Sequence, residues 1–370
     1  MDLRFKIVFG LIALSSAVIA WGLYRSYLIR GPVDPAWFED HELTVVAYPS
    51  FVSSFGPGPQ IVAAFRERCQ CEVKLVNGGD TGVLLQRLLL RPDRMGADVV
   101  LGLDQFSLAE ARESMDWHSL GQGEWLSWKP ALQERVEEDF WPYNWAPMTL
   151  LYKKSEQDLG EVKSWEELFK RIEPQSLALQ DPRTSHPGSQ MVYWLWSRAR
   201  QVALEQGDEL DIDEAFVQEL NRLSPFVHSL SPSWSQSYGL FKRDQAALTF
   251  SYATSPVFHR VVEEDWDIEA LRLTEPHPYQ VEYMGIPASC QQCERAKEFV
   301  LFMLEPEVQQ IIMERNFMFP VIDSVEEETA FAEVSSQWSL QALLGRELEA
   351  EFLDSKERLE KLWVEALRRR

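Results

Sequence analysis

The fold is decided by residues 43–82, LTVVAYPSFVSSFGPGPQIVAAFRERCQCEVKLVNGGDTG. Its first residues, Leu43 to Tyr48, are rich in β-branched side chains, which predicts a buried strand. The Gly-Pro pairs at 56–59 and the glycine loop at 77–82 each lead into a run with apolar residues at helical spacing. Strands that alternate with helices over short connections predict a parallel sheet, and therefore an α/β lobe. The predicted strands of this lobe are residues 43–48, 72–76 and 97–101.

A second set of the same elements begins near Leu150. Strands are predicted at 176–180 and 247–252, and the turn at 181–188 leads into a helix rich in aromatic residues. Residues 231–239 are predicted to be a loop before the last of these strands. This second set predicts a second lobe of the same class.

The order of the segments predicts a middle domain inserted between two parts of another. The chain then crosses twice between the lobes, which predicts a hinge with a cleft beneath it. The predicted parts are an N-terminal segment with a tether (1–41), the first part of lobe 1 (42–145), lobe 2 (146–278), and a return to lobe 1 with C-terminal helices (279–370).

The N-terminus carries an export signal of one of two kinds. Residues 7–24 are 18 uncharged residues after two basic ones, which is at the lower limit for crossing a bilayer. Residues 18–20 form a passable signal-peptidase site, but the apolar run continues beyond them to Tyr24. We favour an uncleaved membrane anchor over a cleaved signal peptide. Either reading predicts that the remainder is periplasmic, tethered to the inner membrane in the first case.

Composition limits the class of partner. A hydrophobic fraction of 45% and a charged fraction of 25% are ordinary for a folded protein. The 58 acidic residues exceed the 36 basic ones, for a net charge of -22, which argues against a nucleic-acid partner. The same charge suits a cationic ligand, although solubility alone also explains an acidic surface.

The four cysteines form two close pairs, Cys69 with Cys71 and Cys290 with Cys293. The first pair is one residue short of the usual zinc spacing, so we favour structural cysteines over a metal site. In an oxidising compartment the second pair could close a small disulfide, whereas a bridge within the first pair would form a strained ring. The pairing stays open at this point.

Aromatic residues gather in the loops that follow the predicted strands, where open parallel sheets bind ligands. Such side chains can hold a flat or cationic ring by stacking, at roughly 0.5–2 kcal/mol for each contact. The alternative is packing, because the chain has 14 Trp, 10 Tyr and 20 Phe and most must be core. The candidates for ligand contact are Tyr48, Phe55, Trp234, Tyr252 and Phe258.

The sequence lacks the common motifs of catalysis. The sequence contains neither a Gly-x-Ser-x-Gly elbow nor a His-Glu-x-x-His pair, and the glycine loop at 78–82 lacks the Gly-Lys-Ser/Thr ending of a phosphate-binding loop. Of the six scattered histidines, His186 and His259 are placed to reach a ligand, although surface or turn positions are the usual explanation. We therefore expect no catalytic residue, no metal and no cofactor.

Several stretches resemble the thiamine-binding periplasmic proteins of bacterial ABC importers. The resemblance runs in order from about residue 43 to 320 and includes the unusual Cys69-x-Cys71 spacing. The matching stretches are Tyr48-x-Ser50-Phe51 with Gly56-Pro-Gly-Pro59, residues 97–104, residues 180–188, Trp234 to Phe241, Ser251 to Pro256, and Phe317-Met-x-Pro320.

This resemblance implies a two-lobed class II periplasmic-binding-protein fold, in which parallel or mixed sheets are flanked by helices and the ligand cleft lies between the lobes. It implies capture of thiamine, thiamine monophosphate or thiamine diphosphate by a monomer and delivery to an ABC permease. By position, Tyr48, Trp234 and Tyr252 would hold the rings. The phosphate end would lie by Asp80, Thr81, Gly82 and Ser185.

The chain departs from the family pattern at four places. At the first, the family's Asp-Gly-x-Ser becomes Asp80-Thr81-Gly82-Val83, which loses a serine hydroxyl and would alter the preference for phosphorylated forms. Phe55 replaces a Trp and Phe258 replaces a Tyr, so each keeps an aromatic face but loses a hydrogen-bond donor. Asn144 replaces an Asp, which removes one charge that would face the thiazolium. The alternatives are a binding lobe or sensor for another cation such as a polyamine, and a thiamine-degrading enzyme on the same fold. The enzyme would need a cysteine nucleophile in the cleft, whereas Cys69 and Cys71 are predicted on the side away from the ligand loops.

Overall fold

The protein is described here by a computed structural model. The predicted N-terminal segment, including the anchor at 7–24, lies outside the described residues. Within the described part of the chain, no helix is both long and apolar enough to cross a membrane. The structure describes residues 42–90, 95–206, 211–325, 329–338, 343 and 345–368, without the side chains of Thr81, Thr329 and Arg368.

The strands of the described residues form one mixed sheet in the order β2-β1-β3-β9-β4-β7-β5-β6, and β8 pairs with β4. β1 pairs in parallel with β2 and β3, as the sequence predicts, and β5 pairs in parallel with β6 and β7. β9 and β4 join these two groups through antiparallel pairs. The strands are β1 Leu43–Ala47, β2 Val73–Asn77, β3 Val99–Asp104, β4 Trp141–Lys153, β5 Leu177–Gln180, β6 Val227–Ser231, β7 Leu248–Tyr252, β8 Ile268–Ala270 and β9 Tyr279–Gly285.

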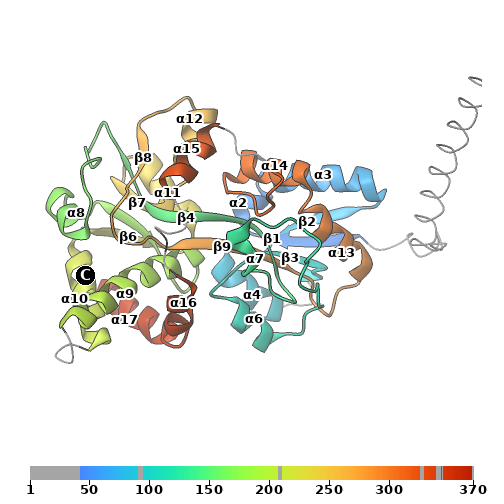
Figure 1. The fold of residues 1–370 in the computed structure, drawn as a ribbon, viewed down its shortest axis with the longest axis horizontal. Helices are drawn as coiled ribbons and strands as arrows, with labels where there is room; N and C mark the ends of the chain where they lie inside the picture. The colour runs from blue at the N-terminus through green and yellow to red at the C-terminus, as the bar shows by residue number, and fades with distance from the viewer. Residues whose placement is uncertain are drawn as a thin grey trace, which may run out of the picture. The chain divides into compact units, whose positions relative to one another are not determined.

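Helices flank the sheet on both groups of strands (Figure 1). The predicted loop at 231–239 is wrong, because Trp234 begins a helix whose first turn is capped by the Ser233 side chain. The helices are α2 Pro49–Val52, α3 Gly58–Cys69, α4 Thr81–Leu90, α6 Leu108–Ser114, α7 Pro130–Gln133, α8 Trp165–Arg171, α9 His186–Gln206, α10 Ile212–Leu223, the 3-10 turn η3 Ser224–Phe226, α11 Trp234–Lys242, α12 Ser255–Val262, α13 Cys293–Phe302, α14 Pro306–Asn316, α15 Thr329–Gln337, α16 Arg346–Leu353 and α17 Lys356–Arg368.

Among the described residues, two large hydrophobic cores and a third, small cluster around Leu151 lie along the sheet, and β4 contributes to all of them. Its first half contributes Trp141 and Tyr143 to one core, and its second half contributes Met148 and Leu150 to the other. Figure 1 shows β4 and β9 running from one group of elements to the other. The chain therefore passes between two packed bodies along these strands, which puts their junction in the middle of the sheet.

The C-terminal helices divide between the two cores. Phe331 of α15 packs in the first core, whereas Phe352 of α16 and Trp363 of α17 are fully buried in the second. A buried ion pair between Arg135 and Glu349 ties α16 to the segment that follows α7. The sequence-based division instead assigns all of residues 279–370 to lobe 1, and its boundaries stay a prediction.

Both cysteine pairs are disulfides. Cys69 is bonded to Cys71 and Cys290 to Cys293. The first bridge encloses Gln70, the left-handed residue (φ 51°) that ends α3. A left-handed C-cap brings the flanking residues close, so this turn accommodates the ring that the sequence-based argument considered strained.

Candidate functional site

A cavity of about 410 Å³ opens where the ends of β1 and β7 meet the first turns of α11 and α12. This is within the usual range for a small-molecule site. Phe55 lies at its rim, where the residue is 83% exposed. The predicted site residues that line the cavity are Tyr48, Phe55, Asp80, Trp234, Tyr252 and Phe258.

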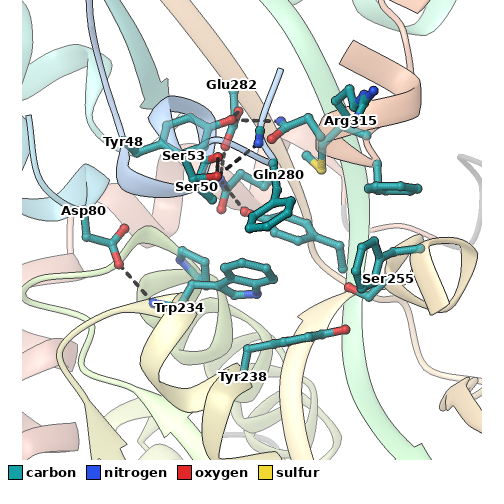
Figure 2. A pocket seen from close by; sticks show the side chains of 18 of the residues that line it. Tyr48, Ser50, Ser53, Asp80, Trp234, Tyr238, Ser255, Gln280, Glu282 and Arg315 are labelled. Atoms are coloured by element: carbon teal, nitrogen blue, oxygen red, sulfur yellow. Dashed lines mark hydrogen bonds between the residues drawn. The ribbon is translucent and has the colours of Figure 1, made fainter. Parts of the chain in front are cut away.

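The cavity has an aromatic wall formed by Trp234, Tyr238 and Tyr252. The rings of Trp234 and Tyr238 are 4.8 Å apart and inclined by 31°, and those of Trp234 and Tyr252 are 6.1 Å apart. Phe258 and Phe317 meet edge to face beside this wall, at 5.2 Å. Figure 2 shows Trp234 and Tyr238 on one side of the cavity, with Tyr48 and Glu282 on the other. A flat ring between the two sides would contact aromatic faces.

Trp234 is fixed by hydrogen bonds at both ends of the residue. Its backbone N–H, in the first turn of α11, donates to Asp80 Oδ2 at 3.0 Å, and its indole Nε1 donates to Ser251 Oγ at 2.9 Å. Asp80 comes from the loop before α4, so this bond links the group of strands around β1 to the helix that carries Trp234. The wall is thus built before any ligand arrives, which limits the entropy lost on binding.

A buried carboxylate, Glu282 in the middle of β9, lies opposite the wall. Its Oε2 accepts hydrogen bonds from Tyr48 Oη at 2.7 Å, Tyr143 Oη at 2.9 Å and Asn144 Nδ2 at 2.8 Å. Gln280 Nε2 lies 3.3 Å from Oε1. These partners are all neutral, and within the described part of the chain no Lys, Arg or His lies at ion-pair distance from Glu282.

The pKa values of Glu282 and its two tyrosine partners follow from their burial and their hydrogen bonds. Burial raises the pKa of Glu282, while the hydrogen bonds from Tyr48, Asn144 and Tyr143 oppose the rise. Burial and the Glu282 charge likewise hold the pKa values of Tyr48 and Tyr143 well above their ordinary range. Both tyrosines are therefore neutral donors, and a cation in the cavity would be the natural counter-charge.

The predicted phosphate end is only partly assembled at the cavity. Asp80 lines it, but Gly82 and Ser185 do not, and the Thr81 side chain lies outside the described residues. Gly82 instead packs against the 181–188 turn, where an added Cβ would lie 2.5 Å from the Thr184 carbonyl carbon. Ser185 is fully buried, and its Oγ has no hydrogen-bond partner among the described residues.

Sequence reasoning missed several lining residues. Tyr238 lies in a segment predicted as a loop. Arg315 and Asn316 lie at the end of α14 without a local signal, and Phe317 enters the sequence argument only as part of the matching stretch 317–320. Glu282 had a usable signal, because it is the one charged residue, at the centre of the mainly apolar and aromatic run Tyr279 to Gly285. Such a residue, if it lies in a central strand, must be buried and must find partners.

His186 and His259 are not the surface or turn histidines that the sequence predicts, and this expectation is wrong. His186 and His259 are buried rather than at the surface, and neither lines the cavity. His186 lies 3.4 Å from the buried Asp104 carboxylate. His259 lies directly behind Tyr238, with its Nε2 at 2.6 Å from the tyrosine hydroxyl.

Comparison with known proteins places this geometry in a family. A family model for bacterial extracellular solute-binding proteins matches residues 48–310. The thiamine-binding periplasmic protein of Brucella melitensis is 36% identical over 286 residues, which covers 77% of this chain and 81% of the relative. The Escherichia coli protein of the same name is 32% identical over 287 residues, covering 75% of this chain and 80% of the relative.

A solved structure of a periplasmic thiamin binding protein is also similar. It aligns with a TM-score of 0.75 at 29% identity, over 91% of this chain and 99% of that one. The two-lobed fold implied by the sequence resemblance is thereby confirmed. This chain belongs to the bacterial extracellular solute-binding proteins, in the family that includes the thiamine-binding periplasmic proteins.

Proposed function

We propose that this protein captures thiamine, thiamine monophosphate or thiamine diphosphate in the periplasm and delivers it to an ABC permease of the inner membrane. It acts as a monomer and breaks no bond. Relatives that are named as thiamine-binding periplasmic proteins at 30–36% identity support both the ligand and the compartment. An N-terminal anchor at residues 7–24 would keep the protein at the membrane surface.

One observation carries the choice of ligand. Glu282 is 3% exposed, accepts hydrogen bonds from neutral groups only, and faces an aromatic wall across the cavity. A buried carboxylate without a cationic partner is costly unless a positive ligand supplies the counter-charge. The thiazolium of thiamine carries a fixed positive charge on a flat ring, so it satisfies both the carboxylate and the wall.

The phosphorylated forms would meet a cation of their own. Arg315 lines the cavity at its exposed side, and within the described residues it has no hydrogen bond or ion pair. A guanidinium in this position suits bidentate contact with a phosphate. We therefore assign the phosphate end to Arg315 in addition to the predicted Asp80 loop.

Isothermal titration of the purified protein with thiamine, its two phosphates and spermidine tests the proposal. We expect saturable binding of at least one thiamine form, and no displacement of that form by spermidine. Tighter binding of spermidine would favour the polyamine alternative. Mass spectrometry after incubation should recover intact thiamine, and cleavage products would indicate the enzyme instead. Absence of binding by all three thiamine forms would refute the proposed ligand.

A further inference from the structure

A chain of hydrogen bonds runs behind the aromatic wall. Trp234 Nε1 donates to Ser251 Oγ at 2.9 Å, and Ser251 Oγ lies 3.0 Å from Ser255 Oγ. Although burial raises the pKa of the Tyr238 hydroxyl overall, the Ser255 side chain in turn acts on this hydroxyl and lowers that pKa. Two faces of the wall, from the start and the second turn of α11, are thus connected through side chains of β7 and α12.

The chain continues away from the cavity through a buried histidine. Tyr238 Oη lies 2.6 Å from His259 Nε2, with the two rings nearly parallel at 9°. His259 Nδ1 lies 2.6 Å from Glu263 Oε2, which also accepts a bond from Lys242 Nζ at 2.5 Å. His259 is fully buried, whereas Glu263 and Lys242 line the outer part of the cavity.

Both ends of this hydrogen-bond chain fix its direction. The indole of Trp234 can only donate, and the carboxylate of Glu263 can only accept. Glu263 Oε2 lies closer to His259 Nδ1 (2.6 Å) than the Lys242 ammonium does (3.4 Å), so Nδ1 carries the hydrogen that faces Glu263, which leaves Nε2 as the acceptor for the Tyr238 hydroxyl. Ser251 and Ser255 lie between these ends. Each must accept a hydrogen bond from the Trp234 side and donate one towards His259. Every polar group in the chain is then satisfied.

Protonation of His259 would break this order. Nε2 would become a donor towards the Tyr238 hydroxyl. That hydroxyl would then face donors on both sides, and its own hydrogen would lose its acceptor. The charges facing His259 are Lys242 from α11, and Glu263 and Asp265 from the segment after α12. Burial, with a contribution from Lys242, holds the pKa of His259 below its ordinary value although Glu263 opposes this, so the ring is neutral at pH 7.5.

We propose that His259 is a positioning residue that orients Tyr238 and, through it, the aromatic wall, so that ligand capture weakens when His259 takes up a proton. The inference about capture rests on the proposed function, since a cationic ligand would also be repelled by the new charge one side chain away. The proposal rests on the hydrogen bond between the buried His259 imidazole and Tyr238 of the wall, and not on titration alone.

Titrations with thiamine at pH 7.5 and pH 5.5 test it. Because the His259 pKa lies below its ordinary value, only part of the protein is protonated at pH 5.5, and we expect wild type to lose about two- to fivefold more affinity over this range than His259→Gln, which keeps a polar group near Tyr238 but does not titrate. Tyr238→Phe removes the contact but keeps the titrating imidazole, so its pH profile should lie between those of wild type and His259→Gln, and a profile equal to that of wild type would overturn the positioning role. His228→Gln is the matched control, since His228 is exposed on β6 away from the cavity, and it should behave as wild type. Because Glu282 and the ligand titrate equally in all variants, identical profiles for wild type and His259→Gln would overturn the proposal.

A second measurement needs no ligand. Nitrogen-15 spectra of the histidine rings, with the His259 signal assigned from its loss in His259→Gln, report the tautomer directly. We expect the neutral Nδ1–H form at pH 7.5, and an Nε2–H form or a charged ring would overturn the assignment. If neither thiamine nor either of its phosphates binds wild type at either pH, the proposed function fails, and the tautomer still decides the direction of the hydrogen-bond chain.

Discussion

Replacing Glu282 by Gln tests the link between the buried carboxylate and a cationic ligand. The change is nearly isosteric, and Gln can keep the bonds from Tyr48, Tyr143 and Asn144 through its oxygen. Its new amide would face Gln280 Nε2, but Gln280 Oε1 is without a partner among the described residues, so rotation of the Gln280 amide restores a bond. We therefore expect the variant to fold.

The magnitude follows from the charge alone. At a separation of about 5 Å and an effective dielectric of about 20, two unit charges attract by roughly 3 kcal/mol. Part of this is offset because the free variant no longer holds a buried charge. We expect affinity for thiamine to fall by about 10- to 100-fold, or roughly 1.4 to 2.8 kcal/mol.

The assay is isothermal titration with thiamine and with an analogue whose thiazolium is replaced by an uncharged ring of the same size. Glu282→Gln should weaken thiamine and leave the uncharged analogue nearly unaffected. Asp98→Asn is the matched control, because Asp98 is also buried and accepts only neutral backbone N–H groups, from Thr44, Gln291 and Gln292. Equal losses for both ligands, or no loss for thiamine, would refute the reasoning.

Three further predictions concern other parts of the molecule. Arg315→Gln should weaken thiamine diphosphate by about tenfold and spare thiamine, since a hydrogen bond to a charged group contributes roughly 1.5–3 kcal/mol; equal effects in titration would remove Arg315 from the phosphate end. Phe352→Ala should lower the free energy of unfolding by about 3–5 kcal/mol in urea titrations, because Phe352 is fully buried among aromatic rings; a loss below about 1 kcal/mol would show that α16 contributes little. Asn144→Asp puts a second carboxylate against Glu282, so thermal unfolding should show a loss at neutral pH that shrinks at acid pH, and a pH-independent loss would contradict like-charge repulsion.

The parallel strands and much of the aromatic wall could be predicted from the sequence. β1, β2 and β3 follow from β-branched runs between glycine loops, and Trp234 and Tyr252 follow from their places beside predicted strand ends. These features are local, so a few neighbouring residues determine them.

The strand β4 could not be predicted, because Pro142 and Pro147 argue against a central strand. The structure accommodates Pro142 through a shift of register between Pro142 and Asn144 in the pairing with β9. The contacts of Glu282 and His259 could not be predicted from the sequence either. Their partners lie far away in sequence or behind a helix that was read as a loop, and no local pattern records such pairings.

The position of Glu282 connects ligand charge to the junction of the two cores. Its strand, β9, is one of the two that run between them. Its partner Tyr48 belongs to the first core, and the neighbouring Gln280 donates at 3.1 Å to Tyr252 of β7, which packs against both cores. Since burial raises the Glu282 pKa and a bound cation lowers it, binding should release protons at pH values between the ordinary and the raised pKa. Titration in buffers of different ionisation enthalpy measures this release. Release by wild type that is absent in Glu282→Gln would place the charge of the ligand at this junction, whereas equal release by both would put the titrating group elsewhere.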